Sequence, residues 1–149
     1  MKLYLHISII LNFLFSNLIF SQEETTKFYI TELRGDISLE MEINNLESNK
    51  GPVYIRILDE NENPVIVGTS PVINYSAEIS FDSISTGKYA IQFFHDENEN
   101  QKMDFNLIGI PKEKFGSSNN VKPVLGPPKF EKMLFNLTEN KKIIMIPVN

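Results

Sequence analysis

Residues 37–43 read Ile-Ser-Leu-Glu-Met-Glu-Ile, and this strict alternation of apolar and polar side chains decides the fold. Successive side chains of a β-strand point to opposite faces, so a period of two predicts a strand with one face in the core. Five other segments alternate in the same way, and we predict strands there too: 53–58, 75–81, 89–94, Phe130–Leu137 and Ile143–Val148.

Helix content should be low, because no segment after Gln22 repeats apolar residues at helical spacing between capping residues. Short strands separated by turn residues are typical of two packed sheets. The sequence therefore predicts an all-β fold, an antiparallel β-sandwich of six to seven strands that is Ig-like or transthyretin-like. One long ordered loop is expected between the fourth strand and the last two.

Length and composition narrow the class of protein. The chain has 149 residues, no cysteine and a formal net charge of -5. This length suits one domain with a real core. The acidic balance argues against a nucleic-acid partner, which a basic surface would attract. The lack of cysteine excludes disulfides, a thiolate nucleophile and cysteine-bound zinc.

The first residues have the layout of a secretory signal peptide. Lys2 precedes a mostly apolar run over residues 3–20, and Ser21 is a small residue at its exit. A membrane anchor is the alternative, but polar residues interrupt the run and no basic cluster follows it. We expect a signal peptide at 1–21, an N-terminal extension or first strand at 22–35, and the β-sandwich domain at 36–149. The protein would then be exported to the periplasm or the extracellular space, with no membrane span left.

Residues 95–129 form the long connection, and they have little strand character. A connection of this length is usually functional or disordered. Several apolar residues within it should pack against the domain and anchor it: Met103, Phe105, Ile108, Ile110, Phe115 and Val124.

The loop opens with a pattern typical of calcium-binding loops. Oxygen-bearing residues stand at positions 1, 3, 5, 7 and 9 of that pattern, where position 7 uses its backbone carbonyl: Asp96, Asn98, Asn100, Lys102 and Asp104. Calcium takes six to eight oxygen ligands, and alternate residues on a tightly curved loop can converge on one point. We therefore predict calcium as a candidate cofactor, and no other.

Two departures weaken this pattern. Gln101 replaces the glycine that makes the sharp turn, and Leu107 replaces the bidentate glutamate at position 12. With two carboxylates the dissociation constant should be about 10⁻⁴–10⁻³ M. Residues 59–63 repeat the letters Asp-Glu-Asn-Glu-Asn without the later ligands, and there we predict a turn bonded to its own backbone. A self-bonded loop without an ion is the alternative at residues 96–104 too.

Enzymatic chemistry has little support in the sequence. His95 ends a predicted strand, and the other histidine lies in the signal segment. A hydrolase using His95 with Asp96 or Glu113 is the alternative. No Gly-x-Ser-x-Gly nucleophile motif is present, however, and neighbouring strand residues point to opposite faces. We expect a protein that is not an enzyme.

Ordered blocks of residues carry a resemblance to a known family. They are Gly87–Ile91, His95–Asn98, Asp104, Gly109–Glu113, Phe115–Asn120 and Gly126–Phe130. Over about Asp36–Val148 the chain resembles small exported bacterial proteins catalogued as domain of unknown function 2141. The resemblance implies a secreted β-sandwich and brings no established activity. A weaker likeness to transthyretin-like and carboxypeptidase-regulatory-like sandwiches rests on the Gly-x-Tyr strand.

These observations favour a non-enzymatic binding module of unknown partner. Loops held by a rigid scaffold commonly carry binding. The candidate binding residues lie at both ends of the long loop: His95, Lys112, Glu113, Phe115, Ser117 and Asn119. The expected partner is a cell-surface or extracellular glycan, peptide or protein.

Overall fold

The computed structural model describes residues 27–30, 34–124 and 126–148. The predicted signal peptide at 1–21 lies outside these residues. Among the described residues, no helix has both the length and the apolar character needed to cross a bilayer.

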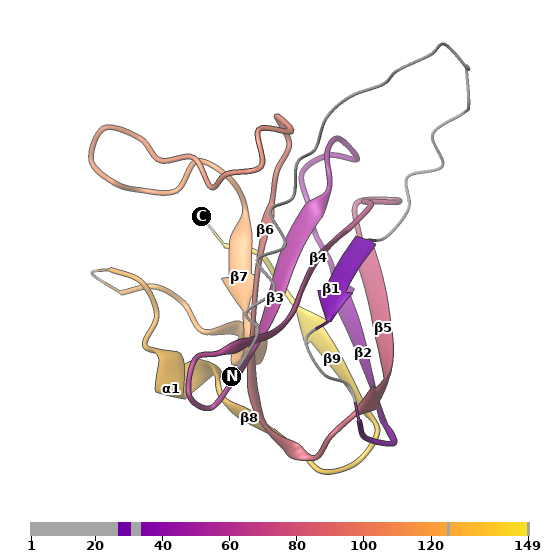
Figure 1. Ribbon diagram of the computed structural model, residues 1–149. Coiled ribbons are helices and arrows are strands. Elements are labelled where there is room, and N and C mark those ends of the chain that lie inside the picture. Colours follow the sequence, from indigo (N-terminus) through magenta and orange to yellow (C-terminus); the bar gives the residue numbers. More distant parts are fainter. Residues whose placement is uncertain (1–26, 31–33, 125, 149) are drawn as a thin grey trace, which may run out of the picture.

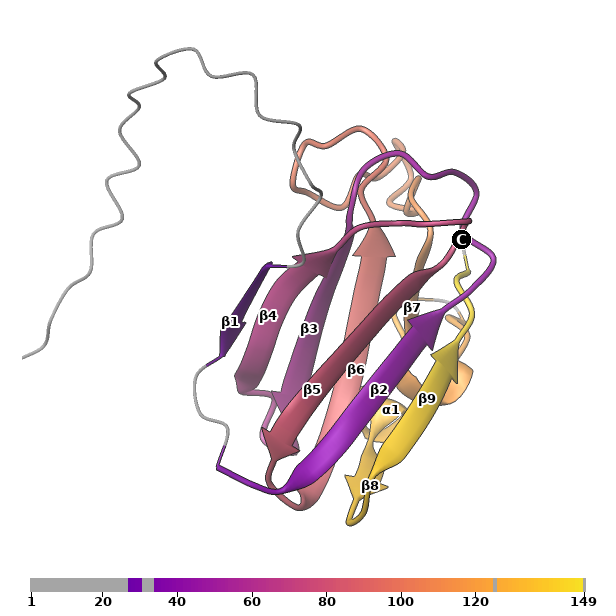
Figure 2. The same cartoon turned by 90° about the vertical axis from the view of Figure 1, so that its right-hand side faces the viewer.

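Two β-sheets pack face to face. The first has the order β1-β4-β3-β6-β7, with β8 paired to the same edge of β6 as β7, and the second has the order β5-β2-β9 (Figures 1 and 2). The strands of the first sheet are β1 (Lys27–Ile30), β3 (Val53–Asp59), β4 (Pro64–Ser70), β6 (Gly87–His95), β7 (Phe115–Ser117) and β8 (Phe135–Leu137). Those of the second are β2 (Ile37–Ile43), β5 (Ala77–Ile84) and β9 (Lys141–Met145).

The space between the sheets is filled by the inward faces of alternating strands. In β2, every apolar residue of 37–43 is buried while Glu40 is exposed. β3 and β6 contribute Ile55, Ile57 and Ile91 from the opposite sheet, all almost completely buried. The pattern that predicted the fold is therefore the pattern of the core, and the prediction of an all-β sandwich is confirmed.

The structure corrects the predictions in three places. Phe130–Leu137 is not one strand, because Phe130–Met133 forms the short helix α1 before β8 begins. Ser118 Oγ donates to the carbonyl of Met133 at 2.5 Å and accepts from the N–H of Ile91 in β6 at 3.0 Å, so tertiary contacts hold the helix against β6. The sheets are not wholly antiparallel, since β9 runs parallel to β2. There are also more strands than predicted: β4 and β7 were not expected, and β1 lies within 22–35, where an extension was the other possibility.

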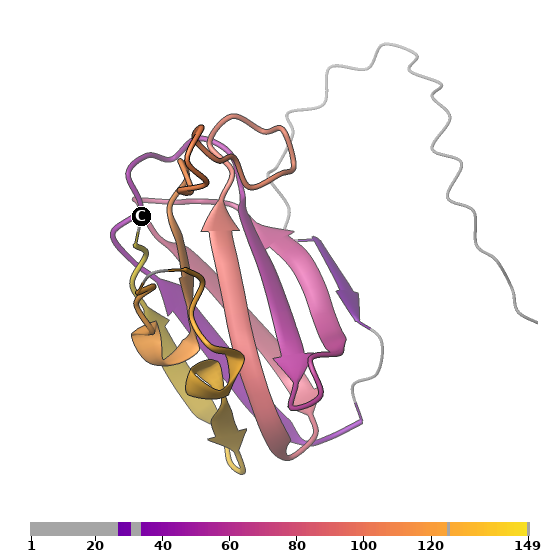
Figure 3. The ribbon, with the colours of Figure 1, turned by 90° about the vertical axis from the view of Figure 1, so that its left-hand side faces the viewer.

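The long connection leaves β6 at one end of the sandwich and returns through β7 (Figures 1 and 3). A short 3₁₀ turn (Ser118–Asn120) follows β7 and leads toward α1. The part of the long connection that lies between β6 and β7, residues 96–114, projects beyond the ends of the strands. We call it the β6–β7 loop. The sandwich thus holds both ends of this loop on adjacent strands.

The alternation in β2 gives a direct test of the core. Leu39 is completely buried between the sheets, so Leu39→Ala should lower the free energy of unfolding by about 2–5 kcal/mol in urea titrations. Ile144→Ala on β9 is the control, because that side chain is exposed, and it should change the free energy by no more than about 0.5–1 kcal/mol. Equal losses in the two variants would contradict the assigned register.

Candidate functional site

The start of the β6–β7 loop is tied to the loop between β2 and β3. The ring of His95 is fully buried, and its Nε2 donates to the carbonyl of Lys50 at 2.7 Å, because a carbonyl can only accept. The backbone N–H of Asp96 donates to the carbonyl of Pro52 at 3.0 Å. Between them, Gly51 has a φ of 65°, and a Cβ there would lie 1.9 Å from the carbonyl oxygen of Asp96. Only glycine allows this close approach.

The two ends of the loop are also joined to each other. The N–H of His95 donates to the carbonyl of Lys114 at 2.8 Å, so the chain returns to the point at which it left β6. The ammonium of Lys114 pairs with Glu47 at 3.0 Å, and Ser48 Oγ donates to Glu97 Oε1 at 2.9 Å. The loop is therefore closed at its base and held from one side by residues 47–52.

Asp96 is the centre around which the chain first turns. Its side chain is fully buried, with Oδ1 accepting from the N–H of Asn100 at 3.1 Å and Oδ2 accepting from the N–H of Gln101 at 2.7 Å. Residues 96–101 thus wrap around one carboxylate.

Asp104 lies against the same turn. Its Oδ2 accepts from the side-chain amides of Asn98 at 2.7 Å and Asn100 at 3.0 Å. Asn100 Oδ1 in turn accepts from the N–H of Lys102 at 2.9 Å. The structure therefore brings the predicted calcium-loop side chains together and does not leave them scattered in solvent. No group of three or more His, Asp or Glu side chains among the described residues is placed so that it could hold a metal ion.

Gln101 makes the sharp turn that a glycine makes in the calcium-loop pattern. Its φ is 64°, in the left-handed region, and Glu99 nearby has a φ of 58°. A side chain in this region is unfavourable by about 1–2 kcal/mol, which the bond from the Gln101 N–H to Asp96 helps to offset. The substitution therefore strains the turn without abolishing it.

Glu113 approaches this cluster from the other end of the loop. It is only 8% exposed, and its Oε2 accepts from the N–H of Asp104 at 3.1 Å, while Oε1 has no hydrogen-bond partner among the described residues. Burial raises the pKa of Glu113, the bond from the Asp104 N–H lowers it, and the negative charges of Asp96 and Asp104 and contact with the Asp96 carboxyl raise it further. Two ionised carboxylates both accept, so that contact is a hydrogen bond only when one of them holds a proton. Glu113 thus lies where the charges of both Asp96 and Asp104 act on it.

The repeated letters at residues 59–63 form a tight turn between β3 and β4, as predicted. Asp59 Oδ1 accepts from the N–H groups of Asn61 and Asn63, and Oδ2 accepts from the Asn63 side chain. These bonds hold the pKa of Asp59 below its usual value. The two copies therefore share a turn around the first Asp, but only in the second does a later acid, Asp104, bond to the Asn side chains of the turn.

The other candidate binding residues are not all available at the surface. Besides His95 and Glu113, Ser117 is buried, and Phe115 in β7 is half-buried. Lys112 and Asn119 are exposed, but both amide hydrogens of Asn119 bond to the carbonyls of Lys132 and Leu134. Of the predicted binding residues, Lys112 is thus the one that is exposed and whose side chain is not held by bonds of this kind.

The expectation that apolar residues anchor the loop is wrong for four of the six. Phe105, Ile108, Ile110 and Val124 are exposed, while Met103 and Phe115 are partly buried. Polar contacts order the loop instead, because Asn106 Oδ1 accepts from the N–H groups of Ile108 at 3.0 Å and Ile110 at 2.9 Å.

This turn leaves four large apolar side chains pointing into solvent, which we call the apolar tip: Phe105, Leu107, Ile108 and Ile110. Leu107 is 106% exposed and Ile108 is 79% exposed. Contiguous exposed apolar residues commonly mark an interaction surface. The sequence interpretation missed this surface because it expected Phe105, Ile108 and Ile110 to anchor the loop against the domain and considered Leu107 only as position 12 of the calcium pattern.

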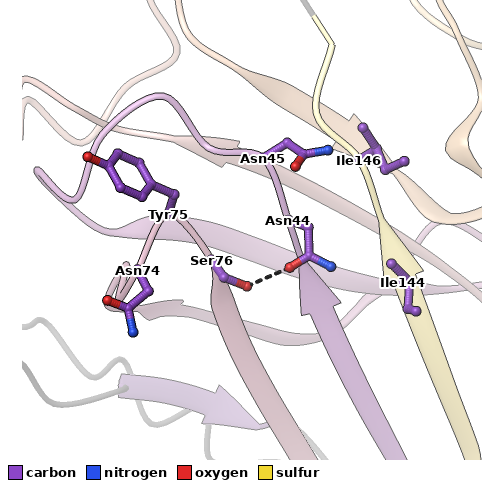
Figure 4. A pocket seen from close by; sticks show the side chains of 7 residues that line it. All are labelled: Asn44, Asn45, Asn74, Tyr75, Ser76, Ile144 and Ile146. Carbon is purple, nitrogen blue, oxygen red and sulfur yellow. Dashed lines mark hydrogen bonds between the residues drawn. The ribbon is translucent and has the colours of Figure 1, made fainter.

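A shallow pocket of about 340 Å³ lies elsewhere, beside the ends of β2 and β9 (Figure 4). It is lined by Asn44, Asn45, Asn74, Tyr75, Ser76, Ile144 and Ile146. Ser76 Oγ donates to Asn44 Oδ1 at 2.8 Å across its floor. None of these seven residues belongs to the predicted site, and none is a carboxylate or a histidine.

Comparison with known families identifies the family to which the chain belongs. A family described as "Uncharacterized protein conserved in bacteria (DUF2141)" matches residues 41–145, which is more than half of the chain. The chain therefore belongs to this family, and the resemblance inferred from the ordered blocks is confirmed. The comparisons with curated proteins and with solved structures found no match.

The left-handed turn at Gln101 leads to a stability prediction. Gln101→Gly should relieve the strained φ and raise the free energy of unfolding by up to about 1 kcal/mol, since the gain is partly offset by the entropy of glycine in the unfolded chain. Differential scanning calorimetry measures the shift. Gln101→Pro, which cannot adopt this φ and lacks the N–H donated to Asp96, should destabilise; a loss in the glycine variant as well would contradict the assigned turn.

Proposed function

We propose that this member of the DUF2141 family is an exported, non-enzymatic binding module whose β6–β7 loop binds calcium. The observation that carries the proposal is the convergence of Asp96, Asn98, Asn100 and Asp104 at the base of the loop. Carboxylate and amide oxygens are ligands that calcium prefers. Rotating an Asn amide by about 180° exchanges its nitrogen for its oxygen, so the amides that now donate to Asp104 can turn oxygens toward a cation.

Calcium would act as a structural clamp for the apolar tip. The tip is connected to the acidic cluster through residues 104–112, where the N–H of Lys112 donates to the carbonyl of Asp104 at 2.8 Å. Holding Asp104 therefore holds the base of the turn that displays Leu107 and Ile108. A surface fixed before binding loses less conformational entropy when it meets a partner.

The chemistry of the tip favours a protein or peptide partner over a glycan. Its side chains are aliphatic or aromatic and carry no hydrogen-bonding group. A sugar would leave its hydroxyl groups without partners on such a surface, whereas an apolar patch of a protein would not. Export, supported by the signal-peptide layout at 1–21, makes an envelope or extracellular protein the partner we propose.

A hydrolase remains the alternative, with His95 as its base. The burial of His95 and its bond to Lys50 favour a structural role for the ring. Turnover of an ester, peptide or glycoside by the exported protein, lost in His95→Gln, would support the alternative.

Calcium should raise the melting temperature of the exported protein. A ligand that binds only the folded state adds RT ln(1 + [L]/Kd) to stability, so 10 mM calcium should add about 1–3 kcal/mol if the dissociation constant is about 10⁻⁴–10⁻³ M. This corresponds to a rise of several degrees over an EDTA-treated sample. Asp96→Asn and Asp104→Asn should each remove most of this rise.

Asp59→Asn is the matched control, because it changes the same first letter of the repeated run without touching the loop. It should lower the melting temperature a little and leave the calcium-induced rise intact. A wild-type melting temperature that does not respond to millimolar calcium would remove the ion from the proposal.

The apolar tip can be tested with the variant Leu107→Ser/Ile108→Ser. Its melting temperature should match that of the wild type, because both side chains are exposed. The wild-type protein should sediment with envelopes of the bacterium that encodes it when calcium is present, and the variant should remain in the supernatant. Equal sedimentation of both proteins would show that the tip is not the contact surface.

A further inference from the structure

The carboxylate of Glu113 occupies an unusual position for an acid. It is more than nine-tenths buried, and one of its two oxygens, Oε1, has no hydrogen-bond partner among the described residues. Burial of a charged oxygen without a partner is costly, and such groups are usually paired, hydrogen-bonded or bound to a metal. The bond from the N–H of Asp104 reaches Oε2 and so satisfies only half of the carboxylate.

The surroundings of Oε1 are negative. The charges of Asp96 and Asp104 both act on Glu113, and its carboxyl contacts that of Asp96. Asp96 and Glu113 are buried and Asp104 is half-buried, and neighbouring carboxylates repel each other unless protons or a cation lie among them.

The course of the chain explains how Glu113 reaches this place. The turn at residues 105–111 reverses the chain, with Phe105 bridged to Pro111, and Lys112 then bonds back to Asp104. Glu113 is therefore set opposite Asp104, across the hairpin. Leu107, which holds position 12 of the calcium pattern, points into solvent and offers no ligand.

We propose that Glu113 is the missing carboxylate ligand of the calcium site. Its carboxylate and those of Asp96 and Asp104, which are not gathered around one point in this arrangement, would turn toward the ion when it binds. Glu113 takes the role of the position-12 glutamate of a continuous calcium loop. In the sequence, the hairpin that carries the apolar tip lies between Glu113 and the other proposed ligands. This inference rests on the proposed calcium-binding function and adds a third acid to it. Calcium takes bidentate carboxylates readily, so Glu113 supplies two of the six to eight oxygens, and its bond from Asp104 N–H fixes its orientation.

The test is calcium titration of exported Glu113→Gln by calorimetry, with metal-free protein as the starting point. Gln keeps the size of the side chain and an oxygen that accepts from Asp104 N–H, but removes one negative charge from the site. We expect the dissociation constant for calcium to rise at least about tenfold, while the melting temperature in EDTA stays the same or rises. Glu99→Gln is the matched control, since it removes a charge from an exposed position of the same loop; it should change the constant less than about twofold.

A second measurement separates coordination from positioning. Europium(III) replaces calcium at oxygen sites, and its luminescence lifetimes in H₂O and D₂O count the waters bound to it. Glu113→Gln should add about one or two waters, because water fills the positions left by the carboxylate oxygens. An unchanged water count, or calcium affinity within twofold of the wild type, would overturn the role of Glu113 while leaving the calcium loop standing. No calcium binding by the wild-type protein would overturn both proposals.

Discussion

The hydrogen bond from the His95 N–H to the Lys114 carbonyl is the constraint on which the β6–β7 loop depends. It joins the end of β6 to the residue before β7, so the residues between them begin and end at one point on the sheet. The cost of closing a loop grows only slowly with its length. Once the base is held by this bond and by His95 Nε2 on Lys50, the rest of the loop needs only local contacts to become ordered. Polar side chains supply those contacts, which is why the apolar residues of the loop are free to face outward.

The two Asp-Glu-Asn-Glu-Asn runs show that the residues that follow a short motif decide which contacts the motif makes. In both, the first Asp accepts backbone N–H groups and curves the chain around itself. In the first run Asp59 also takes the Asn63 side chain, and the turn is complete within five residues. In the second, the Asn side chains reach forward to Asp104, and Glu113 comes back from beyond the hairpin. The difference lies in the residues after the five letters, since Asp104 and Glu113 have no counterpart after β3.

Periodicity predicted the strands whose inward residues are apolar, such as β2 and β3, and with them the sandwich. It missed β4 because Gly68 and Ser70 stand among its inward residues, so the alternation is not hydrophobic. β1 and β7 are too short to show a period. The close approach of Asp96, Asn98, Asn100 and Asp104 was predictable from their spacing within one continuous loop. The position of Glu113 was not predictable from the sequence. Its separation from Asp96 along the chain does not reveal that the hairpin at residues 105–111 brings Glu113 back beside Asp104.

The parallel pairing of β9 with β2 joins the last strand of the domain to one of its earliest. Met145 on β9 is completely buried, so the space between the sheets stays open on that side until residues 141–145 arrive. Pairings this far apart in sequence form late and slowly. If the protein is exported as we propose, the chain enters a translocon by its amino end and the final strand is the last part to cross. The domain would then complete its folding only after translocation. Until β9 pairs with β2 the chain would stay incompletely folded, which is the state that a translocon can transport.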